Sequence, residues 1–269
     1  MPSPVFPPAR LELGLGLLSI GRVWGVGRSE PPSEADALLL LAQALEFGIR
    51  VFDTAPAYAV SEARLGRFLR GLEPSRRGAL LVMTKAGEHW DFESGTSFVD
   101  HGRDALRRSI DRSLELLGRV DVLQIHKATR DVVRDPDVIA AIEHARACGI
   151  TTFGASVADA EAGLAALSTG LYQALQFPLN RTNLALAPLL AAARESNATA
   201  IINRPLAMGG LVIAPEPGAD PVADAFRFVR DKVERGIVLT GTAKPAHLAA
   251  NVAAFRAATM SGMSASPER

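Results

Sequence analysis

Four polar side chains at the ends of apolar runs are suited together to acid–base chemistry. Asp53, Lys85 and His126 each close such a run, and Tyr58 follows Asp53 by five residues. A phenol can transfer a proton, and a neighbouring ammonium stabilises phenolate and so lowers the pKa of the phenol. We expect Asp53 to keep Lys85 charged, because an unpaired ammonium in a desolvated site tends to lose its proton.

Each of these residues also has a structural explanation. Asp53 suits a turn, Lys85 a solvated strand end, His126 a hydrogen-bonded core position and Tyr58 a loop. Catalysis is favoured by their coincidence, because strand ends meet at one face of a parallel sheet or barrel.

Short aliphatic runs alternate with segments of helical periodicity, which predicts eight βα units. Repeated right-handed βα crossovers close into a (β/α)8 barrel, a TIM barrel, whose chemistry lies at the C-terminal ends of the strands. An open, doubly wound sheet is the alternative, but no linker divides the chain, so one domain is expected over residues 1–269 with short flexible ends. The predicted strands are Arg10–Leu18, Ile49–Asp53, Ala79–Lys85, Val120–His126, Ile150–Ser156, Ala174–Phe177, Thr199–Asn203 and Ile237–Gly241.

The predicted helices have recognisable ends. Ser33 is a candidate cap for the first helix and Gly48 closes it, while the second follows Ser61. The others are predicted at Arg103–Leu117, Pro136–Gly149, Val157–Ser168, Leu184–Ser196, Pro221–Arg235 and Pro245–Thr259.

The stretch FDTAPAYAVSEARLG, residues 52–66, resembles the DTA..YG.SE..LG signature of the aldo-keto reductases. LVMTKAG and VDVLQIH resemble the family's strands that end in lysine and histidine, and GTAKPAHLAANVAAF resembles its closing segment. The resemblance implies a (β/α)8 oxidoreductase that transfers hydride between NAD(P)H and an aldehyde, ketone, sugar or alcohol. It implies that Tyr58 is the general acid, with Asp53, Lys85 and His126 as its partners, and that His126 donates a hydrogen bond to the substrate oxygen.

The resemblance also implies a cofactor site across the barrel mouth. Ser156 and Gln176 would hold the carboxamide, and Asn203, Arg204, Pro205 and Leu206 would pass beneath the nicotinamide ring. The segment Gly241–Asn251, with Gly241, Thr242, Lys244, His247 and Asn251, would enclose the adenosine phosphate end. Lys244 and His247 favour NADP(H), with NAD(H) as the alternative. The glycine-rich segment Gly14–Gly25 lacks the third glycine of a dinucleotide fingerprint and is interpreted as a strand.

Three departures from the family pattern stand out. Val157 follows Ser156 where the family has asparagine, Asn203 replaces a stacking tyrosine, and Ala59 replaces the glycine after Tyr58. A catalytically weak, cofactor-binding regulatory protein on the same fold is therefore the alternative hypothesis. Trp24 and Trp90 are candidates to line the substrate pocket, although each could instead pack against its own loop.

The composition excludes several functions. Lys and Arg number 29, as do Asp and Glu, so no net charge favours nucleic acid or an anionic membrane. No apolar run is long enough to span a bilayer, no secretion signal is recognised, and one cysteine allows no intrachain disulfide, so a cytoplasmic location is expected. Cys148 is interpreted as a small buried hydrophobe. The histidines show no paired metal-ligand spacing and no nucleophile elbow occurs, so a small-molecule substrate is expected, without a metal and with the oligomeric state left open.

Overall fold

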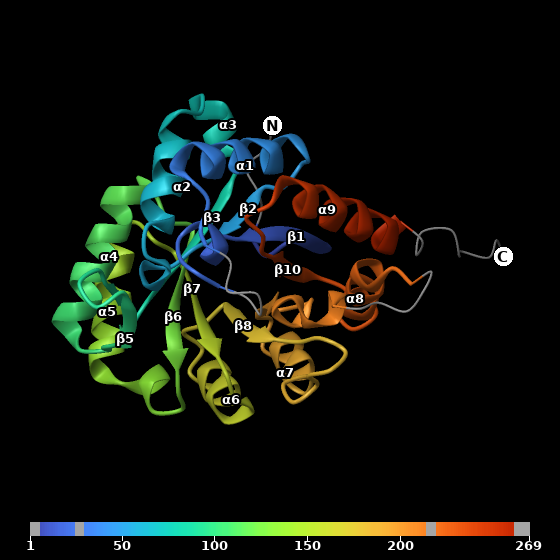
Figure 1. The fold of residues 1–269 in the computed structure, drawn as a ribbon. Coiled ribbons are helices and arrows are strands. Elements are labelled where there is room, and N and C mark those ends of the chain that lie inside the picture. Colours follow the sequence, from blue (N-terminus) through green and yellow to red (C-terminus); the bar gives the residue numbers. More distant parts are fainter. Residues whose placement is uncertain (1–5, 25–29, 214–218, 261–269) are drawn as a thin grey trace.

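Eight parallel strands form a closed barrel in the computed structural model, which describes residues 6–24, 30–213 and 219–260 (Figure 1). Going round the barrel, the strands follow one another in the order β1, β10, β9, β8, β7, β6, β3, β2. All eight predicted strands are present, with bounds that shift by a few residues at most. They are β1 (Leu11–Gly16), β2 (Val51–Asp53), β3 (Leu81–Ala86), β6 (Val122–Ala128), β7 (Thr152–Val157), β8 (Ala174–Pro178), β9 (Thr199–Asn203) and β10 (Gly236–Thr240).

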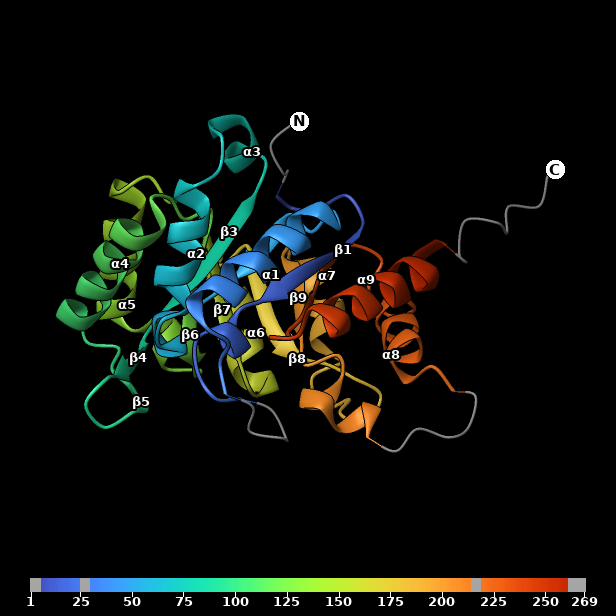
Figure 2. The ribbon, with the colours of Figure 1, turned by 45° about the horizontal axis from the view of Figure 1, so that its top comes forward.

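The eight predicted helices are also present and surround the barrel (Figures 1 and 2). They are α1 (Glu34–Glu46), α2 (Ser61–Arg70), α4 (Arg103–Leu117), α5 (Pro136–Ala147), α6 (Ala160–Ser168), α7 (Leu189–Glu195), α8 (Pro221–Arg230) and α9 (Pro245–Met260). Ser33 caps α1 as predicted, with its hydroxyl accepting from the amide of Asp36.

Two helices begin later than predicted. Asp159 caps α6 by accepting a hydrogen bond from the amide of Ala162, which moves the start past the predicted Val157. The segment before α7 is occupied by turns, including the Asn180–Asn183 bridge, so that this helix begins at Leu189 rather than at Leu184. In both places a polar side chain competes with the helical hydrogen-bond pattern.

Several short elements were not predicted. An antiparallel hairpin, β4 (Glu88–Asp91) with β5 (Thr96–Val99), follows β3 and lies outside the barrel (Figure 2). The short helix α3 (Pro74–Gly78) precedes β3, and four 3-10 segments occur, of which η1 (Leu18–Ile20) and η2 (Pro56–Tyr58) adjoin the barrel mouth. These elements contain too few residues for a hydrophobic period to reveal them.

The hydrophobic core has two layers. A large cluster joins the outward faces of the strands to the helices, with residues such as Phe52, Leu123 and Phe153 fully buried. A smaller cluster of strand residues fills the barrel interior: Val51, Leu81, Met83, Val122, Ala174, Ile201, Ile237 and Leu239. The glycine-rich segment forms β1 as predicted, and a Cβ on Gly14 would lie 2.7 Å from the Leu239 side chain. A packed interior of this kind leaves the chemistry to the barrel ends.

Among the described residues, no helix is long and apolar enough to cross a membrane. The predicted flexible ends and the Pro- and Gly-rich loop after β9 fall largely on residues 1–5, 261–269 and 214–218, which lie outside the described residues.

Candidate active site

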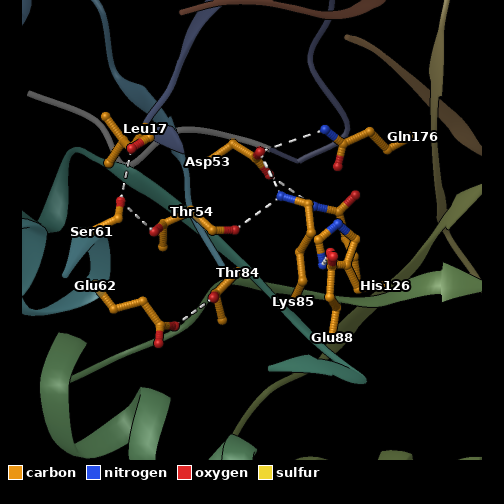
Figure 3. Close-up of polar contacts among 11 residues, drawn as sticks. Leu17, Asp53, Thr54, Ser61, Glu62, Thr84, Lys85, Glu88, His126 and Gln176 are labelled. Atoms are coloured by element: carbon orange, nitrogen blue, oxygen red, sulfur yellow. Dashed lines mark hydrogen bonds and ion pairs between the residues drawn. The ribbon is translucent and has the colours of Figure 1, made fainter. Parts of the chain in front are cut away.

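A buried ion pair lies at the C-terminal end of β2 and β3. The Lys85 Nζ atom is 2.6 Å from Asp53 Oδ2 and donates a second hydrogen bond of 2.9 Å to the carbonyl of Thr54 (Figure 3). Burial opposes the charge on Lys85, but Asp53 and Tyr58 outweigh that effect, so that the pKa of Lys85 is raised. The prediction that Asp53 holds this ammonium charged and in place agrees with the geometry.

Tyr58 lies over this ammonium. It ends η2, its side chain is almost entirely buried, and Lys85 Nζ is 5.1 Å from the centroid of its ring. Burial raises the pKa of Tyr58 above its ordinary value, and the positive charge of Lys85 offsets only part of this rise. The expectation of a net lowered tyrosine pKa is therefore wrong for the unliganded protein, because desolvation of phenolate outweighs the attraction of the neighbouring cation.

His126, on β6, completes the group. Its ring meets that of Tyr58 edge-on, with centroids 6.0 Å apart, and its Nδ1 atom is 3.1 Å from Glu88 Oε2. Burial, followed by the charges of Lys85 and other cations, lowers the pKa of His126 well below its ordinary value, so that the ring is neutral.

Glu88 bears on which nitrogen of His126 carries the single proton. The Nδ1 atom makes no well-aligned hydrogen bond, so that its approach to Glu88 is a close electrostatic contact. A carboxylate in this place stabilises a proton on Nδ1, whereas the predicted hydrogen-bond donation to substrate requires a proton on the other nitrogen, Nε2.

The loop that carries Tyr58 is fastened to its surroundings by the residues after it. Ser61 donates a hydrogen bond to the carbonyl of Leu17 and bonds the hydroxyl of Thr54, while Glu62 accepts one of 2.6 Å from Thr84 (Figure 3). Burial raises the pKa of Glu62. The serine and glutamate of the signature thus connect the start of α2 to β2 and β3 rather than entering the reaction site.

The predicted carboxamide-binding residues lie on neighbouring strands. Ser156 on β7 is in register with Gln176 on β8, and Asn203 ends the adjacent β9. The Oε1 atom of Gln176 and the Oδ1 atom of Asn203 are buried acceptors without a hydrogen-bond partner in the described part of the chain. A bound amide could supply the missing donors, so these residues fit a nicotinamide carboxamide.

The segment predicted to pass beneath the nicotinamide ring follows β9 and has an unusual backbone. Arg204 adopts φ of +53°, and Ala207 and Met208 also have positive φ. The carbonyl of Arg204 accepts a hydrogen bond from Asn180, and its guanidinium lies 5.8 Å from the Trp24 ring centroid. Pro205 and Leu206 continue the turn. Strained backbone of this kind is often retained near binding sites.

The predicted adenosine-phosphate segment connects β10 to α9. Gly241, Lys244 and His247 are exposed, and the amide of Lys244 donates to the hydroxyl of the buried Thr242. Asn251 is different, because it is buried in α9 and its amide donates to Thr240 at 2.7 Å. Its side chain therefore fastens α9 to the barrel strand β10.

The two tryptophans proposed for substrate contact border one cavity. This open cavity of about 760 Å³ is lined by Trp24, Trp90 and Ala59, the residue that directly follows Tyr58. The cavity therefore reaches the segment that carries Tyr58, which fits a substrate pocket.

Three residues near the site were not predicted. Gln124 donates a hydrogen bond of 3.0 Å to Oδ1 of Asp53. It lies two residues before His126 on the same strand, so both side chains point to the same face, and this spacing could have revealed it. Glu88 reaches His126 because the chain reverses at Gly87, with φ of +109°, into a hairpin too short to predict. Arg22 also borders the pocket, but it lies in the segment Gly14–Gly25, whose glycines indicate a strand and give no sign of a binding residue.

Cys148 is exposed, and the expectation that it is buried is wrong. Its Sγ atom lies 3.8 Å from His144 Nε2, which bonds Asp111 at 2.6 Å. These three are a group with metal-ligand atoms within 4.8 Å of one another, brought together from α4 and the end of α5. Paired-histidine spacing could not reveal this group, because its three side chains are of different types and only His144 is a histidine.

The fold is a closed (β/α)8 barrel, and Asp53, Tyr58, Lys85 and His126 are gathered at the C-terminal ends of its strands. Residues 12–221 match the model of the aldo/keto reductase family. The chain belongs to this family.

Several relatives are named as sugar dehydrogenases. The chain is 32% identical over 245 residues to D-threo-aldose 1-dehydrogenase of Pseudomonas sp, a match covering 77% of this chain and 69% of that enzyme. It is 36% identical over 118 residues to L-galactose dehydrogenase of Arabidopsis thaliana, but this match spans only 42% of the chain and 33% of the enzyme.

A solved structure from Pseudomonas aeruginosa that is classed with the aldo-keto reductases shares 30% identity and a TM-score of 0.75. The alignment covers 92% of this chain and 90% of that one. The similarity thus extends over nearly the whole fold.

Proposed function

We propose that this protein is an NAD(P)-dependent oxidoreductase that interconverts an aldehyde or ketone with the corresponding alcohol or sugar. The observation that carries the proposal is the buried Lys85 ammonium, held 2.6 Å from Asp53 beneath the ring of Tyr58 at the barrel mouth. Family membership and the sugar dehydrogenases among the relatives support the same reaction class.

The cofactor would lie across the ends of β7 to β10. Gln176 and Asn203 offer unpaired buried acceptors to its carboxamide, and Lys244 and His247 are exposed at the start of α9, where a phosphate would be stabilised by the helix dipole. When bound, the nicotinamide supplies or accepts the hydride. A 2′-phosphate would find two cationic partners here, which is why we propose NADP(H) ahead of NAD(H).

Tyr58 is the proposed proton donor in reduction. An alkoxide is a much stronger base than phenolate, so a phenol with a raised pKa still protonates it, and it stays protonated throughout the neutral pH range. Lys85 stabilises the phenolate that remains, and Asp53 keeps Lys85 charged. His126, a neutral imidazole at the same mouth, orients the substrate oxygen.

Cofactor titration followed by turnover tests the proposal. We expect NADPH to quench the intrinsic fluorescence of Trp24 and Trp90, to bind more tightly than NADH, and to be oxidised when aldehydes or aldoses are added. Binding without turnover of any carbonyl in a broad panel would contradict the enzyme and support the regulatory alternative, which Val157 and Asn203 favour at the carboxamide site.

A further inference from the structure

Arg22 lines the candidate substrate pocket and carries a charge that the proposed reaction does not use. It follows η1 and borders the same cavity as Trp90 and Ala59. Its guanidinium centre lies 5.0 Å from the Trp90 ring centroid, and its buried Nε has no hydrogen-bond partner in the described chain. Among the described residues, Arg22 forms no ion pair. The nearby carboxylates of Asp53 and Glu88 contact Lys85 and His126 instead.

The charge of Arg22 reaches the reaction site. It is among the cations that depress the pKa of His126, and its neighbour Gly21 packs against the backbone of Tyr58 so closely that a Cβ would lie 1.9 Å from the Tyr58 carbonyl oxygen. Arg22 therefore lies one residue from the point where the loop after β1 contacts the backbone of Tyr58. Of the acidic residues nearby, Glu88 contacts His126 and Ser97, while the exposed Glu30 lines the same cavity and forms no ion pair with Arg22 within the described part of the chain.

Arg22 lies at the edge of the expected cofactor site. It follows β1, whose neighbours in the barrel are β10 and β2, and its stacking partner Trp90 lies on the hairpin after β3. The residues expected to hold the cofactor follow β7 to β10. A planar guanidinium that lies over an indole and lines an open cavity is suited to a carboxylate.

We propose that Arg22 and Trp90 form a subsite for a carboxylate on the substrate, so that the enzyme prefers carbonyl compounds that carry an acidic group at one end. This inference rests on the proposed function, because the carboxylate would be bound while the carbonyl faces Tyr58. Trp90 would stack on the atoms between the two groups.

A matched pair of aldehydes tests the subsite. We expect 4-carboxybenzaldehyde to be reduced with a kcat/KM at least about tenfold above that of methyl 4-formylbenzoate, which has the same ring without the charge. Arg22→Gln should lower kcat/KM for the acid by at least about tenfold, mainly through KM. It should leave the ester and the Kd of NADPH unchanged. Arg103→Gln, which alters an exposed ion pair on α4, is the matched control and should change neither.

Three results would overturn the subsite: no preference for the acid in the wild type, equal losses for acid and ester in Arg22→Gln, or weakened NADPH binding, which would assign Arg22 to the cofactor's pyrophosphate. A binding assay separates these from failure of the proposed function. Benzoate should bind at least about tenfold more tightly than benzamide, with quenching of tryptophan fluorescence that Arg22→Gln removes, even if no aldehyde is turned over. Equal binding of the two by the wild type would also reject the subsite.

Discussion

At the residue scale, the pKa of Tyr58 is set by the burial of its ring and by the charge of Lys85. Burial alone makes phenolate costly, and it raises the pKa of Tyr58. The 2.6 Å contact with Asp53 keeps Lys85 positively charged, and this charge offsets part of the rise in the pKa of Tyr58. We therefore propose that the tyrosine releases its proton only to a strong base, such as an alkoxide.

The raised pKa of Tyr58 gives the pH dependence of the reaction a definite sign. Alcohol oxidation needs phenolate as the base, so its rate should rise with pH through the neutral range and reach no plateau until pH approaches the raised tyrosine pKa. Aldehyde reduction needs the phenol, which is already protonated, so Tyr58 should add no pH dependence below that point. Initial rates in both directions from pH 6 to 10 check this, and an oxidation plateau near pH 7 would contradict it.

Replacing Lys85 removes the only cation that contacts the phenol ring among the described residues. Lys85→Met should raise the pKa of Tyr58 further and reduce kcat/KM by about a hundredfold or more, equally in both directions at a given pH because the overall equilibrium is fixed. Lys232→Met, at an exposed lysine in the turn after α8, is the control for the same change of side chain. Comparable activity in the two variants would exclude the electrostatic role of Lys85.

Glu88 is expected to act through His126, as a positioning residue. Glu88→Gln keeps the shape and an acceptor for Ser97 but removes the charge beside Nδ1, so that the imidazole proton is no longer held there. Because the proton is then free to occupy Nε2, from which the imidazole donates to the substrate oxygen, we expect kcat for reduction to rise by up to about tenfold while the KM and the NADPH affinity change little. Steady-state kinetics of Glu88→Gln and Glu88→Asp test this, and an unchanged kcat in Glu88→Gln would leave Glu88 with a purely structural role.

At the scale of elements, the loops around the barrel mouth are positioned by close backbone contacts. Residue 21, just after η1, packs against the end of η2, and Gly87 makes room for His101, whose ring bonds the carbonyl of His126. On Gly87 a Cβ would lie 2.3 Å from that ring. Small residues at these points allow the loops after β1, β2 and β3 to converge on one site.

Gly21 provides a direct test of this packing. In Gly21→Ala the new methyl would overlap the Tyr58 carbonyl, so that η2 must shift, and we expect activity to fall at least about tenfold and stability by about 1–3 kcal/mol. Gly78→Ala is the matched control, because a Cβ there meets nothing within 4 Å. Urea unfolding and kcat/KM measure both effects. Equal behaviour of the two variants would show that the contact does not position Tyr58.

At the scale of the whole molecule, the alternation of strands and helices could be predicted because the core repeats regularly. Runs such as Thr199–Asn203 are bounded by turn residues and form strands of the barrel as predicted. Since the barrel brings strand ends together, the meeting of Asp53, Lys85 and His126 could also be predicted. The contact of Glu88 with His126 could not, because Glu88 is placed by a hairpin whose two strands pair only with each other, whereas Trp90 on the same hairpin lines the cavity as predicted.

The balance of energies at Tyr58 was equally inaccessible to sequence reasoning. The residue types predict an attraction between ammonium and phenolate, but only the three-dimensional surroundings show how deeply the ring is buried. Cys148 illustrates the same difficulty, since it lies in an apolar helical pattern and yet is exposed at the end of α5.

The central claim is that Tyr58 transfers the proton at a mouth that binds NADPH. The most direct measurement compares wild type and Tyr58→Phe, first by NADPH fluorescence titration and then by single-turnover reduction of an aldehyde. We predict an unchanged Kd for NADPH and a rate of aldehyde reduction lower by at least about a thousandfold, since the phenylalanine keeps the ring and removes only the acid. Reduction by Tyr58→Phe at a rate close to that of the wild type would contradict the account.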